Sequence, residues 1–211
     1  FMLSLLVTFV DAIVQPNYFV KIPVKIIFFL AIPMTFFAFN KKEFKSFEAL
    51  FSFKKEGIFK SLLLGILVYI FILGGYFLTS NIIDYSNVTS NLTESMGITA
   101  NNFIYVFFYI SLMNSFLVDF FFRGYGFITL KNHTNRIFAY LFSSLLFAIY
   151  HIGMLSGSFH VSALILLFSF LVIAGCLFNY LNEKNNNIYP SWFVHMFANF
   201  AINTVGLILF G

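Results

Sequence analysis

The sequence carries very little charge. Only 9% of its 211 residues are Asp, Glu, Lys or Arg, whereas 60% are hydrophobic. An ordinary soluble domain has roughly 25% charged residues, which keep its surface in contact with water. Twelve basic and eight acidic side chains are too few to cover a chain of this length. The composition therefore excludes a conventional soluble globular protein.

Cysteine and arginine are also scarce. Cys176 is the single cysteine, so the chain can form no intramolecular disulfide and has no zinc-type cysteine pair. The only arginines are Arg123 and Arg136. Phe, Ile, Asn and Lys are preferred instead, and their codons are AT-rich, which indicates a bacterial source. No hydrophilic stretch is long enough for a second domain, so residues 1–211 are expected to form a single transmembrane domain.

What the sequence does contain is a series of long apolar runs. A bilayer core of about 30 Å is crossed by a helix of about 20 apolar residues. The runs are Phe1–Val14, about Val20–Phe39, about Ile58–Thr79, about Asn102–Phe127, Ile137–Leu155, Val161–Leu181 and Ser191–Phe210. They are too long for strands and do not alternate strictly, which argues against a transmembrane barrel. The sequence predicts an all-α polytopic membrane protein with about seven transmembrane helices.

The basic residues gather in alternate loops. Lysines follow the second run, Lys131 and Arg136 follow the fourth, and Lys184 follows the sixth. The opposite loops, 80–101 and 156–160, have no Lys or Arg. By the positive-inside rule, the N-terminus is expected in the cytoplasm and the C-terminus outside. The net charge of +4 is thereby explained without nucleic acid, which is not an expected partner. The expected location is the bacterial plasma membrane, as a multi-pass protein in contact with lipid.

Two parts of the chain do not fit this simple pattern of basic loops. Lys21 and Lys25 are exceptions to the rule, because they lie on the lysine-poor side. The stretch 45–55, which includes Lys54 and Lys55, mixes charges with aromatic residues. Two readings of it stay open: a segment lying in the headgroup layer, or an ordinary basic loop.

Several polar side chains lie inside the apolar runs. Because ionisable groups are costly at bilayer depth, each is a candidate functional residue. Asp119 and Arg123 are four residues apart on the fourth run and can form an ion pair within one helix. His151 lies on the fifth run, and His195 and Asn199 lie one turn apart on the seventh. Any one of them alone fits a structural role, but together such groups can polarise a water and hold an oxyanion.

Their order along the chain resembles that of the CPBP family of intramembrane peptidases, which includes CaaX proteases, bacteriocin-processing enzymes and Abi proteins. That family shows Glu-Glu-x-x-x-Arg, then Phe-x-x-x-His, then His-x-x-x-Asn. This chain has Val118-Asp119-Phe-Phe-Phe-Arg123-Gly, then Phe147-x-x-x-His151, then His195-x-x-x-Asn199. The resemblance covers about residues 100–205. It implies a CPBP-type helical bundle with a polar pocket between the fourth, fifth and seventh helices.

Val118 is the departure from the family pattern. The resemblance implies that the first glutamate and the first histidine activate water, while the second histidine and the asparagine stabilise the oxyanion. Valine cannot accept a proton, and Asp119, which matches the second glutamate, points about 100° away around the helix. In an enzyme, Asp119 would have to be the base, with His151, His195 and Asn199 in their family roles. Arg123 would pair with Asp119.

Two functions therefore stand side by side. The first is an intramembrane endopeptidase that cleaves a membrane-associated peptide or protein, in bacteriocin or peptide maturation or in self-immunity. The second is a catalytically impaired pseudo-protease that binds or scaffolds a membrane partner. No cofactor is expected, and a zinc ion held by His151, His195 and Asp119 is a weaker alternative. A small transporter is a third class, but the sequence lacks the further charges and the helix breaks in matching halves that it would need.

Overall fold

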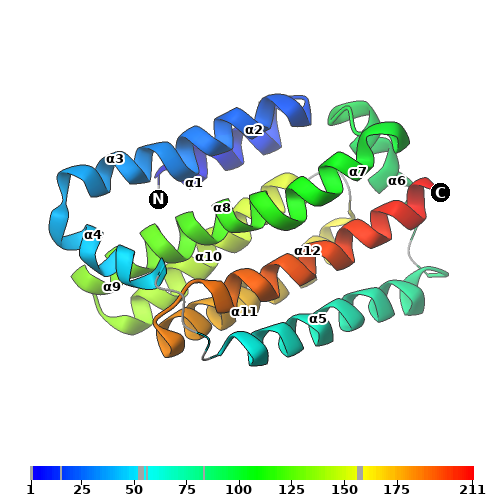
Figure 1. Ribbon diagram of the computed structural model, residues 1–211. Coiled ribbons are helices and arrows are strands. Elements are labelled where there is room, and N and C mark those ends of the chain that lie inside the picture. The colour runs from blue at the N-terminus through cyan, green and yellow to red at the C-terminus, as the bar shows by residue number, and fades with distance from the viewer. Residues whose placement is uncertain (1, 15, 52–54, 56, 83, 156–158) are drawn as a thin grey trace.

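The computed structural model describes residues 2–14, 16–51, 55, 57–82, 84–155 and 159–211. Almost all of these residues are helical, and no strand occurs among them. The helices in chain order (Figure 1) are α1 (Met2–Phe9), α2 (Tyr18–Ile26), α3 (Ile32–Phe39), α4 (Lys41–Glu48), α5 (Ile58–Thr79), α6 (Ser86–Ser90), α7 (Ala100–Phe108), α8 (Ser115–Asp119), α9 (Ile128–His133), α10 (Arg136–Leu155), α11 (Val161–Asn185) and α12 (Tyr189–Phe210).

Within the described residues, six helical stretches are long and apolar enough to cross a membrane. They are Tyr18–Phe39, Ile58–Thr79, Ala100–His133, Arg136–Leu155, Val161–Asn185 and Tyr189–Phe210. A shorter apolar helix, Met2–Val14, precedes them and corresponds to the first predicted run, of which Phe1 lies outside the described residues. The prediction of an all-α polytopic membrane protein is confirmed.

Ala100–His133 is the longest of these stretches and the most buried. It joins α7, α8 and α9 through two π-helical segments, Tyr109–Asn114 and Phe120–Phe127. Its 34 residues correspond to about 50 Å at 1.5 Å per residue, which exceeds the bilayer core. Single π-helical turns inside α-helices often mark functional sites. The second segment here contains Arg123, and Asp119 directly precedes it.

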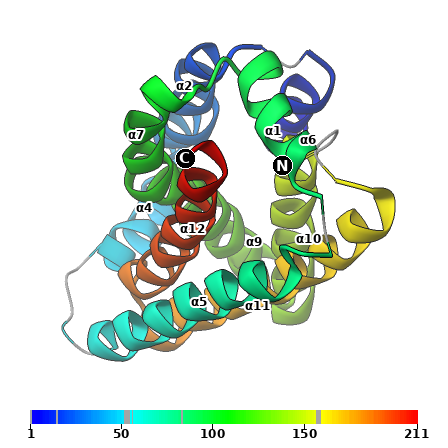
Figure 2. The ribbon, with the colours of Figure 1, turned by 90° about the vertical axis from the view of Figure 1, so that its right-hand side faces the viewer.

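The long helices run side by side through the molecule (Figures 1 and 2). α12 packs along α5, and α10 packs along α11. The α10–α11 pair approaches closely at Gly175, where an added Cβ would lie only 2.9 Å from the Ser144 Cα. The Asn179 Nδ2 donates to the Ser144 Oγ at 3.3 Å beside this contact. Small residues and side-chain hydrogen bonds are the usual means of joining helices in a membrane, where lipid is as apolar as the protein.

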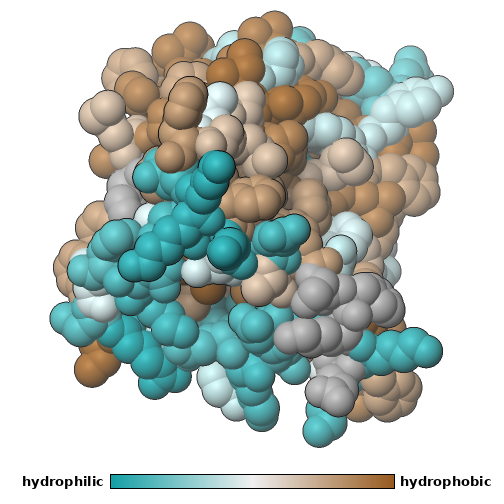
Figure 3. Space-filling model, turned by 60° about the vertical axis from the view of Figure 1, so that its left-hand side comes forward, coloured by the Kyte–Doolittle hydropathy of each residue, from teal (hydrophilic) through white to brown (hydrophobic). Residues whose placement is uncertain are grey.

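One end of the bundle carries most of the exposed charge, and Figure 3 shows hydrophilic surface gathered over part of the face turned to the viewer. At this end Glu183 on α11 lies 2.8 Å from Lys131 and 2.7 Å from Arg136. Glu43 on α4 accepts a hydrogen bond from Asn132 at 3.0 Å. These pairs tie α4, α9, α10 and α11 together. Which side of the membrane this end faces stays a prediction.

The basic stretch after the second span begins with a short amphipathic helix. In α4 the lysines Lys41, Lys42 and Lys45 are exposed, whereas Phe47 is buried against Phe37 and Phe120. The Phe37 and Phe47 rings stack with centroids 4.2 Å apart. α4 is therefore packed onto the bundle, which agrees with the interfacial reading better than with a plain loop. Lys54 lies outside the described residues.

Lys21 and Lys25, which did not fit the charge rule, are both buried beside Asp11. The Lys21 Nζ lies 3.3 Å from one Asp11 carboxylate oxygen, and the Lys25 Nζ lies 3.7 Å from the other. All three side chains are at most 4% exposed. The two lysines are thus part of an internal ion cluster that joins the first apolar helix to α2, and they do not contact solvent.

Candidate functional site

The centre of the site is a buried ion pair on the longest helix. The Arg123 Nε lies 3.5 Å from the Asp119 Oδ1, and both side chains are at most 1% exposed. The guanidinium carbon lies 4.0 Å from the ring centroid of Phe147 and 4.9 Å from that of Phe178. A buried charge needs a partner of opposite sign, and aromatic ring faces add further attraction for a cation. Asp119 and the two rings therefore hold Arg123 in place.

Asp119 also faces α12. The His195 Nδ1 lies 3.4 Å from the Asp119 Oδ1, and the Ser191 hydroxyl lies 3.4 Å from the other oxygen. Ser191 and His195 are one turn apart, so both reach the same carboxylate. His195 is only 4% exposed. The structure therefore places the His195 and Asp119 side chains at the same level along the bundle.

His151 completes a group of polar side chains from three helices. Its Nδ1 lies 2.8 Å from the carbonyl oxygen of Phe147. Because a carbonyl only accepts, this nitrogen carries the proton, and the Nε2 keeps a free electron pair. The rings of His151 and His195 have their centroids 6.0 Å apart. The carboxylate, the arginine and the two histidines therefore lie in one region between these helices.

Asn199 lies one turn beyond His195 on α12. Its Nδ2 donates to the carbonyl oxygen of Ile110 at 3.2 Å, in the first π-helical segment of the long helix. An amide nitrogen has two N–H groups, so this contact uses one donor and leaves the other for a second acceptor. The hydrogen bond fixes the direction in which the amide points.

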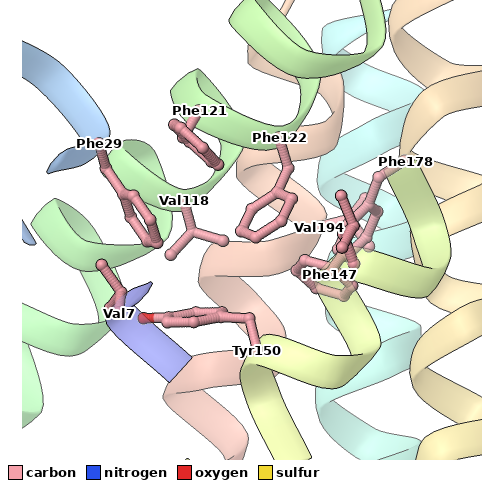
Figure 4. Packing of buried hydrophobic residues seen from close by; sticks show 10 residues of the cluster. Val7, Phe29, Val118, Phe121, Phe122, Phe147, Tyr150, Phe178 and Val194 are labelled. Atoms are coloured by element: carbon pink, nitrogen blue, oxygen red, sulfur yellow. The ribbon is translucent and has the colours of Figure 1, made fainter. Parts of the chain in front are cut away.

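The position of the missing glutamate is filled by apolar packing. Val118 is fully buried, in a cluster with Val7, Phe29, Phe122 and Tyr150. Figure 4 shows its side chain lying among Phe29, Phe122 and Tyr150. Val7 and Phe29 come from the N-terminal helices, outside the segment that resembles the family. Val118 thus lies in an apolar part of the core.

Asp119, His151 and His195 are the residues that the sequence offered as ligands for a zinc ion. In the part of the chain that the structure describes, no three His, Cys, Asp or Glu side chains are grouped so that they could hold a metal ion. His151, His195 and Asp119 do not form such a group as they stand. The zinc alternative stays a prediction.

Two residues that contact the site, Ser191 and Phe178, were not identified from the sequence. Ser191 contacts Asp119, and its spacing of four residues before His195 could have revealed it. Phe178 stacks on the His195 ring with centroids 5.4 Å apart, and it also lies over Arg123. No pattern in the sequence marks Phe178, because it is one of 34 phenylalanines.

Fold and site together define a polytopic α-helical membrane protein with a buried carboxylate–arginine–histidine centre. Residues 100–201 match the family model described as Rce1-like, type II CAAX prenyl endopeptidase Rce1-like. All three motifs lie within the matched residues. The resemblance to the CPBP family of intramembrane peptidases is thereby confirmed. No curated protein and no solved structure matches the chain.

Proposed function

We propose that the chain is an intramembrane endopeptidase of the CAAX-protease type that cleaves a membrane-associated peptide or protein. The observation that carries this proposal is the 3.4 Å contact between Asp119 and His195, inside the segment that matches the family model. The two atoms lie within ion-pair distance but form no hydrogen bond in the structure. Catalytic hydrogen bonds often tighten only when substrate binds, and a carboxylate that then accepts the Nδ1 proton orients the ring and stabilises its protonated form. This is the arrangement by which a histidine becomes a general base.

In this proposal Asp119 acts through His195, which differs from the expectation that Asp119 itself is the base. The Asp119 side chain is fully buried, and its oxygens face Arg123, His195 and Ser191. They are therefore turned toward protein groups, and the His195 Nε2 is the ring nitrogen that does not face Asp119. The Asp119–His195 pair replaces the glutamate that Val118 lacks.

The reaction is a hydrolysis. The oxygen of a water molecule forms a bond to the scissile carbonyl carbon while the His195 Nε2 takes its proton. The His151 Nε2 accepts the other water hydrogen and orients the nucleophile. The free N–H of Asn199 donates to the oxyanion. When the carbon–nitrogen bond breaks, His195 returns its proton to the leaving amine, and no cofactor is consumed.

The biological setting is part of the same proposal. A substrate of this enzyme would be a peptide or protein held at the membrane, as in bacteriocin or peptide maturation or in self-immunity. We place it in a bacterial plasma membrane, and the distribution of lysines supports an orientation with the N-terminus in the cytoplasm.

The second function is that of a pseudo-protease that binds a membrane partner. Val118 favours it, because the side chain at the position of the family's base is valine and is enclosed by aromatic rings. In that case Asp119, Arg123 and His195 stabilise the fold without activating water. The two functions differ in whether removal of the His195 imidazole changes a chemical rate.

The test uses the full chain in lipid nanodiscs with a library of membrane-anchored fluorogenic peptides. His195→Ala is expected to lose about 10²–10⁴-fold in cleavage rate, which is typical of a lost general base. His160→Ala is the matched control, because His160 is exposed and belongs to none of the three motifs. A wild-type chain that cleaves no peptide but retains a membrane protein on purification would support the pseudo-protease instead.

A further inference from the structure

A hollow is lined by residues at the C-terminal ends of α5 and α12. These ends lie at the opposite end of the bundle from α4 and α9 (Figure 1). The hollow has a volume of about 350 Å³ and is lined by Tyr76, Ser80, Asp84, Tyr85, Thr89 and Leu209. None of these residues belongs to the three motifs. Two aromatic rings, a carboxylate and several hydroxyls meet in it, so its chemistry differs from that of the apolar surface around the spans.

The two tyrosines form an aromatic corner. Their ring centroids are 5.4 Å apart and their planes meet at 62°. The hydroxyl oxygens of Tyr85 and Thr79 lie 2.9 Å apart. The Thr79 hydroxyl donates its single proton to the Gly75 carbonyl at 2.8 Å. In the contact between the two hydroxyls, Tyr85 is therefore the donor and Thr79 the acceptor. This bond fixes the Tyr85 ring against the end of α5.

Asp84 places a negative charge beside the rings. It is exposed, and it accepts a hydrogen bond from the backbone N–H of Ser86 at 2.9 Å. This bond lowers the pKa of Asp84 below its usual value, so the carboxylate is ionised at neutral pH. The loop 80–101 has no Lys or Arg, and no ion pair involving Asp84 occurs among the described residues.

A carboxylate next to aromatic ring faces is the arrangement that attracts an organic cation, above all an alkylammonium group. The surface beside the pocket is strongly apolar: Phe77 is 59% exposed, Leu78 80% and Ile82 82%. On a membrane-spanning chain, such side chains at the end of a span contact lipid. The pocket therefore offers a polar corner for a headgroup next to a surface for acyl chains.

We propose that this pocket binds the ammonium headgroup of a bilayer lipid. Asp84 provides the charge, the Tyr76 and Tyr85 faces contact the cation, and Phe77 and Leu78 contact the chains. The site is independent of the peptidase centre and of the proposed reaction.

Native mass spectrometry of the full chain in detergent tests this proposal, with phosphatidylethanolamine and phosphatidylglycerol added at equal concentrations. The wild type is expected to bind more phosphatidylethanolamine than phosphatidylglycerol. Asp84→Asn keeps the acceptor for Ser86 but removes the charge, and it should lower phosphatidylethanolamine occupancy by about threefold or more. Tyr85→Leu should lower it as well, whereas Tyr85→Phe, which keeps the ring, should retain most of it.

Glu94→Gln is the matched control, because Glu94 is a second acidic residue of the same loop that does not line the pocket. A further arm adds choline chloride alone, and displacement of the lipid by choline shows that the headgroup cation is recognised. Equal binding of both lipids, or unchanged binding in Asp84→Asn, overturns the proposal. Displacement by a neutral sugar but not by choline overturns it too, because the pocket would then be a sugar site.

Discussion

At the centre of the site, the Asp119 carboxylate has three polar neighbours on two helices. Arg123 is on its own helix, and His195 and Ser191 are on α12. A charge buried this deeply in a membrane protein is costly unless it is paired. Asp119 and Arg123 should therefore depend on each other for stability, whatever chemistry the site performs.

The coupling can be measured with Asp119→Asn, Arg123→Met and the double variant. Either single change leaves an uncompensated charge and is expected to cost about 3–5 kcal/mol of unfolding free energy. The double variant should lose clearly less than the sum of the two. Chemical or thermal unfolding in detergent provides the measurement. Strictly additive losses would show that the two side chains are not coupled.

At the scale of elements, the sequence predicted the membrane spans well because their apolar runs are long. Ile58–Thr79 has the bounds that the pattern indicated. The fourth span was expected to end at about Phe127 but continues to His133, and in this added part Asn132 and His133 contact Glu43 of α4. Those partners are 89 and 90 residues apart, and hydropathy contains no information on such pairs.

The part of the site that lies within one helix could be predicted from the sequence. The i,i+4 spacing of Asp119 and Arg123 indicated their contact from local geometry alone. The packing of Val7 and Phe29 against Val118 depends on which helices are neighbours in the bundle. Helices with apolar residues on every side give no such information, so this part could not be inferred from the sequence.

The buried ion cluster of Asp11, Lys21 and Lys25 is expected to stabilise the packing of the short N-terminal helix against α2. Asp11 faces both Lys21 and Lys25, so Asp11→Asn leaves two buried ammonium groups without a carboxylate. It should lower the unfolding free energy by about 3–5 kcal/mol. Adding Lys21→Met and Lys25→Met to this variant should recover much of the loss. Thermal unfolding in nanodiscs measures this recovery. A triple variant less stable than Asp11→Asn would mean that other contacts, such as that of Lys25 with the Met154 sulfur, stabilise the lysines more than Asp11 does.

At the scale of the whole molecule, the charges separate the two ends of the bundle. Residues 80–101 have no basic side chain, whereas Lys131, Arg136 and Lys184 lie at the other end. This distribution predicts that the loop 80–101 faces outward. The single cysteine makes the orientation accessible to labelling once Cys176 is replaced by serine.

In that background, Asn87→Cys should react with a membrane-impermeant maleimide on intact cells. Lys184→Cys should react only after the membrane is permeabilised. Both residues are exposed, so access to the reagent depends on the side of the membrane alone. The reverse pattern would invert the predicted topology, without affecting the proposed chemistry.

The most direct test of the account is the cleavage rate of Asp119→Asn beside wild type and Val118→Glu, with one membrane-anchored peptide. If Asp119 orients His195 as a base, wild type cleaves and Asp119→Asn is slower by about 10²–10⁴-fold. Melting temperatures exclude unfolded samples. An inactive wild type together with an active Val118→Glu would contradict the account, because the family's carboxylate at that position would then be indispensable and its loss would have made this chain a pseudo-protease.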